Sequence, residues 1–164
     1  PKTGETLEAG EKGELVVTPL VKEAMPLLRY RTGDITMLME DECPCGRGPK
    51  LARFFGRSDD MLTIRGINVF PSQIEHVLKN IPDVGDQFMV YIDRINHLDE
   101  MTIEVEMSKS VFSGELADLS RLQAKIMKAL QETLTIRARV ELKEPGSLPR
   151  FEGKAKRVID RRTV

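Results

Sequence analysis

The fold is decided by residues 61–82, which read MLTIRGINVFPSQIEHVLKNIP. The first part of this stretch is strand-like, and the Arg65-Gly66 pair in its middle predicts a β-bulge at the glycine. Ser72 and Glu75 have the spacing of a capping box, in which each side chain accepts a hydrogen bond from the other residue's backbone N–H. The apolar positions that follow share one helical face, namely Ile74, Val77, Leu78 and Ile81. The stretch therefore predicts a strand followed by an amphipathic helix.

Three further segments alternate between apolar and polar residues, which is the pattern of half-buried strands. They are residues 88–92, 101–107 and 138–142. In the second of these, Glu104 and Glu106 fall on the face opposite the apolar residues. We therefore expect both carboxylates to lie in water.

The strongest helical pattern covers residues 115–134. One stripe at helical spacing gathers their apolar side chains, which are Leu116, Leu119, Leu122, Ile126, Met127, Leu130 and Leu134. From residue 61 onward the order of elements is therefore β-α-β-β-α-β. This order predicts an α+β fold class, with the ferredoxin-like split pattern and both helices on one face of a sheet.

The first 58 residues have a different character. Short strands are expected at residues 14–18 and 35–39, with turn signals around them and no amphipathic helix to close a separate core. The chain also opens at Pro1 without a methionine. We therefore expect this short, all-β region to be an annex of a larger body.

The composition excludes several classes of protein. Lys and Arg number 25 against 26 Asp and Glu, and the net charge of −1 argues against a protein built mainly to bind nucleic acid. Apolar residues make up 40% and charged residues 31% of the chain, as in soluble globular proteins, and no apolar run is long enough to span a membrane. With two cysteines and no signal-peptide pattern, a reduced, cytoplasmic setting is expected.

Cys43 and Cys45 lie in a tight turn that also contains proline and glycine, which is the chemistry of half a zinc knuckle. A structural zinc site needs four ligands, and no histidine lies nearby in sequence. Two interpretations remain open. One is a partial zinc site completed by residues upstream of this chain, and the other is a turn with two small buried thiols.

Three polar segments stand out because each breaks a local structural rule. In residues 30–34, Asp34 follows a glycine at the mouth of a strand, where an aspartate is commonly a turn residue but can also bind a ribose diol. Residues 56–60 form a charged stretch before the first predicted strand. Residues 149–157 belong to a basic cluster typical of a solvated tail, in which Lys154 follows a glycine and can reach a neighbouring site.

Taken together, the order and spacing of these segments resemble the adenylate-forming ligases, a superfamily that includes acyl-CoA synthetases and luciferase. The residues that carry the resemblance are Gly13-Glu14-Leu15, Tyr30-Arg31-Thr32-Gly33-Asp34, Gly56-Arg57-Ser58-Asp59-Asp60 and Gly153-Lys154 with Arg157 behind them. Residues 65–75 and the turn at residues 43–47 are similar to the phenylacetate–CoA ligase branch in particular.

The resemblance implies that the chain is the C-terminal fragment of a longer enzyme. Residues 1–58 would be the end of the large N-terminal AMP-binding domain, and residues 59–164 would be the C-terminal lid domain. Asp59 matches the hinge residue, with Asp60 as a second candidate. Gly66 matches a residue on the loop beside the pantetheine channel of CoA in the thioester-forming state.

The resemblance also implies roles in nucleotide chemistry. Asp34 would bind the ribose hydroxyls, and Arg57 would lie near the ribose and phosphates. Lys154 would be the catalytic lysine that bridges the carboxylate substrate and ATP during adenylation, where a cation offsets the repulsion between two anions. Glu152 departs from the serine that many family members have in this loop.

The implied function is that of an aryl acid–CoA ligase, which converts phenylacetate, ATP and CoA into phenylacetyl-CoA, AMP and pyrophosphate through acyl-adenylate, with Mg²⁺ as cofactor. The implied partners are the acid, ATP, CoA and the upstream domain of the same polypeptide, while a homodimer is left open. Since the family's phosphate loop and acid pocket lie upstream, the fragment alone is expected to be inactive.

Two alternatives stay open at this point. One is an adenylyltransferase of the coenzyme F390 synthetase kind, which this branch also resembles and which would modify a deazaflavin. The other is a stand-alone small-molecule-binding module, because β-α-β-β-α-β domains often act as regulatory sensors.

Overall fold

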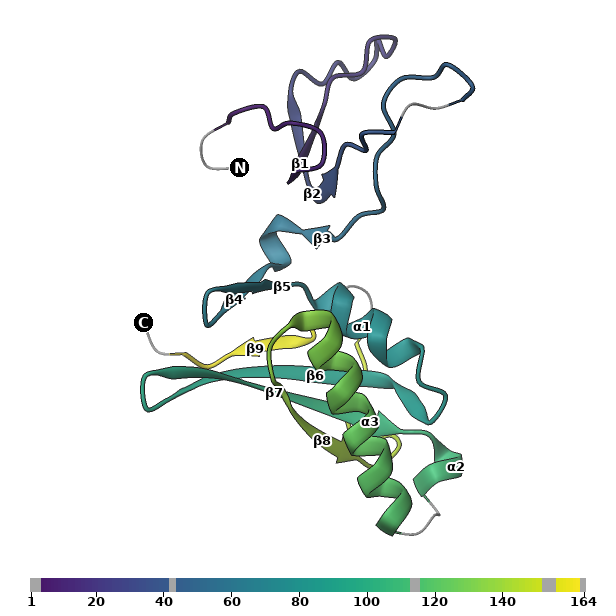
Figure 1. The fold of residues 1–164 in the computed structure, drawn as a ribbon, viewed down its shortest axis with the longest axis vertical. Helices are drawn as coiled ribbons and strands as arrows, with labels where there is room; N and C mark the ends of the chain where they lie inside the picture. The colour runs from purple at the N-terminus through teal and green to yellow at the C-terminus, as the bar shows by residue number, and fades with distance from the viewer. Residues whose placement is uncertain (1–3, 42–43, 113–115, 152–155, 163–164) are drawn as a thin grey trace. The chain divides into compact units, whose positions relative to one another are not determined.

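The computed structural model describes residues 4–41, 44–112, 116–151 and 156–162. The chain divides into two compact units, Pro1–Met61 and Leu62–Val164 (Figure 1). The predicted boundary after residue 58 refers to the domains of a longer enzyme, and that assignment stays a prediction. Among the described residues, no helix combines the length and the apolar character that crossing a bilayer requires.

The first unit contains a three-stranded antiparallel sheet in the order β1-β2-β3. β2 (Tyr30–Met37) lies between β1 (Lys12–Val17) and β3 (Gly56–Arg57), and β3 runs directly into a short 3-10 helix, η1 (Ser58–Asp60). Both strands expected here are present. Ile35 is the only buried hydrophobic side chain among the described residues of this unit, so the sheet has little core of its own.

Residues 61–69 form a hairpin rather than one bulged strand. β4 (Leu62–Ile64) pairs antiparallel with β5 (Ile67–Val69), so the loop consists of Arg65 and Gly66 alone. Their φ angles are +52° and +78°, the combination that a two-residue type I′ turn requires. The predicted bulge was therefore wrong, because the glycine serves a complete chain reversal.

Helix α1 (Pro71–Lys79) begins earlier than the predicted capping box. Its N-cap is Phe70, and Pro71 occupies the first helical position, where its fixed φ suits a helix and no N–H is needed. The Phe70 N–H donates to Oε1 of Gln73 at 3.0 Å, and the Gln73 N–H donates to the Phe70 carbonyl at 2.9 Å. Gln73 thus closes the cap in place of Glu75, because the proline starts the helix upstream.

The second unit is built on a four-stranded sheet in the order β8-β7-β6-β9. Its strands are β6 (Val84–Ile95), β7 (Leu98–Met107), β8 (Arg139–Lys143) and β9 (Val158–Asp160). β6 and β7 form an antiparallel hairpin, while β8 runs parallel to β7 and β9 runs parallel to β6. Helices α2 (Lys109–Phe112) and α3 (Leu116–Leu134) lie between β7 and β8 in the chain.

Helices α1 and α3 both cover one face of this sheet (Figure 1). The α+β fold class and the predicted order of the elements are confirmed, with two differences in detail. The first predicted strand stays outside the sheet as the β4–β5 hairpin, and an unpredicted strand, β9, occupies the edge beside β6. A strand of three residues among basic neighbours is too short to show alternation, which is why the pattern indicated a tail.

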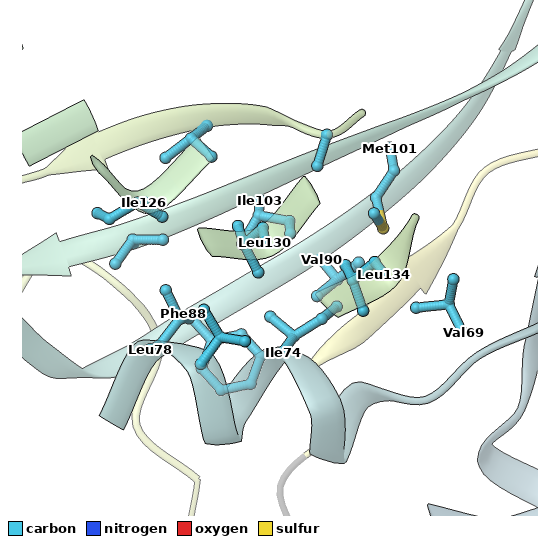
Figure 2. Close-up of a cluster of buried hydrophobic side chains, with 14 of the residues drawn as sticks. Val69, Ile74, Leu78, Phe88, Val90, Met101, Ile103, Ile126, Leu130 and Leu134 are labelled. Atoms are coloured by element: carbon cyan, nitrogen blue, oxygen red, sulfur yellow. The ribbon is translucent and has the colours of Figure 1, made fainter. Parts of the chain in front are cut away.

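Figure 2 shows the apolar core between the two helices and the sheet. Its side chains include Ile74, Leu78, Phe88, Val90, Met101, Ile103, Ile126, Leu130 and Leu134. Burying one side chain of this size stabilises the fold by about 1.5–3 kcal/mol. From Leu119 onward, the side chains of the predicted α3 stripe are buried or partly buried except Met127, which is 42% exposed, because it lies about 100° round the helix from Ile126.

Glu106 was expected in water and is instead buried, with 2% of its surface exposed. The segment that follows β8 covers this face of the sheet. The Leu148 N–H donates to Glu106 Oε1 and Arg150 Nη2 donates to Oε2, both at 2.8 Å. Glu104 is partly shielded and pairs with Lys143 Nζ at 2.8 Å. The strand pattern missed this because Leu148 lies 42 residues further along the chain.

Leu130→Ala should lower the free energy of unfolding by about 2–5 kcal/mol, since it removes a fully buried side chain and leaves a cavity. Met127→Ala, on the same helix, should cost less than about 1 kcal/mol because much of that side chain is already in water. Urea unfolding followed by circular dichroism measures both. Equal losses would contradict the core assigned to α3.

The stability contributed by Glu106 should depend on pH. Burial raises the pKa of its carboxyl, but hydrogen bonds from the Leu148 and Gly146 backbone and from Arg150 outweigh burial and leave the pKa below its ordinary value of 4.5. A lowered pKa contributes stability above the unfolded-state pKa and loses it as pH falls. Glu106→Gln should therefore destabilise the chain by about 1–3 kcal/mol at pH 7, and the difference should narrow below pH 4.5.

Unfolding curves of the Glu106→Gln variant and the unsubstituted chain, taken on both sides of that pH, measure the difference. Glu100→Gln is the matched control, since it removes an exposed carboxylate from the same strand. A Glu106→Gln penalty that does not change with pH would rule out the ionised carboxylate as its cause.

Candidate functional site

Asp34 and Arg57 face each other in the first unit. They are direct partners in the β2–β3 register, and Arg57 Nη1 lies 3.4 Å from Asp34 Oδ1. Both side chains stay partly open to water, at 34% exposure for Asp34 and 40% for Arg57. The pair therefore offers a hydrogen-bond acceptor suited to hydroxyl groups beside a planar donor suited to phosphate oxygens.

Asp59 holds the same guanidinium. Arg57 Nε donates to Asp59 Oδ1 at 2.9 Å and Nη2 donates to Oδ2 at 3.1 Å, which is a bidentate arrangement that fixes the plane of the group. Nη1 also donates to the Thr32 carbonyl at 3.1 Å. The hydrogen bond to Asp59 raises the pKa of Arg57 above its ordinary value, so the side chain stays cationic. Asp60, the second hinge candidate, is exposed at the end of η1.

Gly33 permits the close approach of Arg57 to β2. Its φ is +79°, a conformation that other residues rarely adopt. A Cβ at this position would lie 2.7 Å from Arg57 Nη2. Any other residue here would therefore strain the backbone and push the guanidinium aside.

Glu14 is a supporting residue for which the sequence analysis predicted no role. It lies on β1, and its side chain is 6% exposed. Oε1 accepts the Gly33 N–H at 3.2 Å, and Oε2 accepts a hydrogen bond from Arg31 Nε at 3.0 Å. The hydrogen bond from Arg31 holds the pKa of this carboxyl below its ordinary value. In the sequence, the available signal for Glu14 was a carboxylate directly before the apolar run Leu15-Val16-Val17.

Gly66 lies in the second unit, in the turn of the β4–β5 hairpin. A Cβ at Gly66 would have no atom within 4 Å. The turn therefore presents bare backbone to open space, which is where a ligand can approach a chain closely.

Lys154 lies outside the described residues, as do Glu152 and Gly153, so its predicted role stays a prediction. The residues on either side are held by other parts of the second unit. Arg150 pairs with Glu106, as described above. Arg157 lies 3.5 Å from Glu75 on α1, stacks over the Phe88 ring at 4.5 Å, and accepts the Val90 N–H at its carbonyl at 2.8 Å.

The predicted partial zinc site is not tested. Cys43 lies outside the described residues, and Cys45 is exposed. Within the described ranges, no group of three or more His, Cys, Asp or Glu is placed to hold a metal ion. Neither zinc nor Mg²⁺ therefore has a ligand set among those residues.

The second unit also matches a known family. Residues 66–162 fit the model of the AMP-binding enzyme C-terminal domain. The chain belongs to the AMP-binding enzyme C-terminal domain family.

One curated relative extends the match of this AMP-binding enzyme C-terminal domain over the first unit. The chain is 42% identical over 176 residues to a phenylacetate-coenzyme A ligase of Thermus thermophilus. The alignment covers 99% of this chain and 40% of that protein. The chain thus spans well under half the length of the relative that it matches.

Solved structures of CoA ligases also match this chain. A 2-hydroxyisobutyryl-CoA ligase in complex with R3-HIB-AMP matches 98% of this chain and 34% of its own, with a TM-score of 0.82 and 38% identity. A domain of a phenylacetate-coenzyme A ligase from Bacteroides vulgatus matches 64% of this chain and 95% of its own, with a TM-score of 0.59 and 34% identity.

Gly33→Ala should cost about 1–2 kcal/mol of stability because alanine is strained at φ +79°. It should also shift the Arg57 Nε–H resonance in NMR spectra, since the new methyl group displaces the guanidinium. Gly48→Ala is the control, because a Cβ there meets nothing within 4 Å. Similar effects of the two substitutions would contradict the tight packing of Arg57 on Gly33.

Proposed function

We propose that this chain is the C-terminal part of a carboxylic acid–CoA ligase that activates phenylacetate or a related aryl acid. The observation that carries the proposal is the 42% identity to a phenylacetate-coenzyme A ligase over 99% of this chain. In the first half-reaction the carboxylate attacks the α-phosphorus of ATP and pyrophosphate leaves. In the second, the CoA sulfur attacks the acyl carbon and AMP leaves.

Asp34 and Arg57 would form this chain's contribution to the nucleotide site. The Asp34 carboxylate accepts hydrogen bonds from ribose hydroxyls, and the Arg57 guanidinium donates to phosphate oxygens. Their shared exposure and their fixed geometry beside Gly33 support these roles. The nucleotide would need no rearrangement of the arginine, because Asp59 and Thr32 already hold its plane.

Lys154 would supply the positive charge of the first half-reaction. Two anions meet when the carboxylate approaches the phosphate, and a lysine between them lowers the energy of the charge that develops in the transition state. This assignment rests on the resemblance at Gly153-Lys154. Mg²⁺ would arrive with ATP.

A change of lid orientation would separate the two half-reactions. We place the hinge at Asp59, since η1 lies directly before the division between the two compact units at Met61. Gly66 would then serve the second half-reaction, where its open turn backbone lies beside the pantetheine arm of CoA. A cytoplasmic location fits a chain with two cysteines and substrates such as ATP and CoA.

A small hydroxy acid is the second candidate substrate. It is favoured by the similarity to a 2-hydroxyisobutyryl-CoA ligase over 98% of this chain. None of the residues assigned above chooses between the two acids, because each one would serve the nucleotide, CoA, the reacting carboxylate or the hinge.

The decisive experiment assays the full-length protein that contains this chain for AMP release with ATP, CoA and each acid. Release that depends on phenylacetate and CoA supports the proposal. Activity with 2-hydroxyisobutyrate alone would transfer it to the second candidate. AMP transfer to a deazaflavin without any need for CoA would overturn both in favour of an adenylyltransferase.

Lys154→Ala in the full-length protein should slow acid-dependent pyrophosphate exchange by about 10²–10³-fold or more, because it removes charge stabilisation from the adenylation step. Thioester formation from supplied acyl-adenylate should remain largely intact. Lys156→Ala, which removes an exposed lysine two residues later, is the control. Equal loss of both half-reactions in Lys154→Ala would refute the role assigned to this lysine.

A further inference from the structure

Arg162 joins three strands of the second unit through one guanidinium. Nη1 donates to the Thr63 carbonyl on β4 at 2.8 Å and to Asp99 Oδ2 on β7 at 2.9 Å. Nη2 donates to Asp160 Oδ2 on β9 at 2.6 Å, and Nε donates to Oδ1 of the same residue at 2.9 Å. The Arg162 side chain is 18% exposed and that of Asp99 is 12% exposed. Such a shielded, multiply bonded side chain is unusual in a stretch that the sequence pattern predicts to be a solvated tail.

The β4–β5 hairpin that Arg162 contacts has few stabilising contacts within itself. It has only three residue pairs and belongs to a two-stranded sheet separate from the main one, and isolated two-stranded hairpins are marginally stable. Ile64, at the turn end of β4, and Val69, at the base of the hairpin, are buried in the core, at 1% and 0% exposure. Arg65 and Gly66 of the turn itself are exposed, so polar contacts help to fix their backbone.

Asp99 also contacts the turn directly. Arg65 Nε donates to the Asp99 carbonyl at 2.7 Å, while the Asp99 carboxylate accepts from Arg162. Thr63 on β4 and Arg65 in the turn are thereby linked to one position at the start of β7. Arg65 has a φ of +52°, and a non-glycine residue in this region is held there by its surroundings.

The charges in this cluster are complementary. The hydrogen bond from Arg94 lowers the pKa of the Asp99 carboxyl, with a further contribution from Arg162. The hydrogen bonds to Asp160 and Asp99 raise the pKa of Arg162. All partners therefore stay ionised over the pH range in which a ligase works, and the tie persists.

The cluster is remote from the anchors that flank residues 152–155. Arg157, on the C-terminal side of that segment, is five residues before Arg162 along an extended chain, or about 16 Å at the usual strand rise. Arg157 has its own contacts with Phe88 and Glu75. The two ends of β9 are thus held by separate sets of contacts.

We propose that Arg162 is a positioning residue for the thioester-forming half-reaction, because it holds the backbone of the turn that carries Gly66. The inference rests on the proposed function, which gives Gly66 its place beside CoA. The guanidinium acts through the turn and touches no substrate. Its loss removes the hydrogen bond to the Thr63 carbonyl and the ion pair with Asp99, and leaves the Arg65–Asp99 hydrogen bond as the remaining polar contact between the turn and β7. The turn backbone is then held less firmly relative to the incoming thiol.

The test measures the two half-reactions separately in the full-length protein. Arg162→Gln should slow CoA-dependent thioester formation from supplied acyl-adenylate by about 10-fold or more, since a displacement of about 1 Å at a reacting centre has such an effect. Acid-dependent pyrophosphate exchange should stay within about twofold of the unsubstituted enzyme. Equal loss in both assays, or no loss in either, would overturn the proposal.

Arg161→Gln is the matched control. It removes the same charge one residue away, where Arg161 stacks over Tyr91 at 4.3 Å and lies 4.0 Å from Asp93, both of them on β6 and not on the hairpin. It should leave both half-reactions unchanged. If Arg162→Gln does not fold, Arg162→Lys decides by the same comparison, since an ammonium cannot reach Thr63, Asp99 and Asp160 together.

The unsubstituted enzyme separates this inference from the proposed function. An enzyme that forms no CoA thioester at all refutes the proposed function. An enzyme that forms thioester normally, with Arg162→Gln equally active, refutes only the role of Arg162.

Discussion

One face of the four-stranded sheet carries a continuous apolar surface, and α1 and α3 together exclude water from it (Figure 2). The layout of the second unit depends on that burial. It fixes which side of β6 and β7 faces the helices, and it seats the β4–β5 hairpin through Ile64 and Val69. Everything outside this core has to be positioned by polar contacts.

Those polar contacts occur where the chain leaves the core. Glu106 holds the segment after β8 through Leu148 and Arg150, and Arg162 holds the hairpin turn. Each is a charged side chain whose partners approach from a distant part of the chain. Exposed ion pairs contribute little to stability, but these two are shielded and supported by backbone hydrogen bonds, so they define position as well as adding energy.

Sequence patterns predicted the parts of the fold that depend on local spacing. The stripe of α3, the apolar face of α1 and the apolar positions of β6 and β7 are all properties of neighbouring residues, and among the described side chains they are confirmed except at Met127. The patterns failed at Glu106, because the residues that bury it, Leu148 and Arg150, lie far away in sequence. They failed at β9 for the same reason, because its partner strand is β6. They also failed at Gly66, where a short strand on each side of a glycine pair is hard to distinguish from one bulged strand.

In the candidate site, too, the sequence identified individual residues but not the contacts between distant segments. The resemblance picked out Asp34, Arg57 and Asp59 separately, and the structure joins them through a single guanidinium. Glu14 is part of the resemblance but received no role from it, because that role depends on the pairing of β1 with β2. No spacing rule along one strand can reveal which side chain the next strand will place beside it.

The parallel pairing of β9 with β6 has a consequence for biosynthesis. Val90 on β6 pairs with Val158 on β9. One edge of β6 therefore stays unpaired during synthesis until residues 158–160 have been added. Until then β6 presents unpaired N–H and carbonyl groups, which is the kind of edge that recruits strands from other chains. The second unit can therefore complete its sheet only after residues 158–160 have been made, and until then the nascent chain is exposed to misassociation.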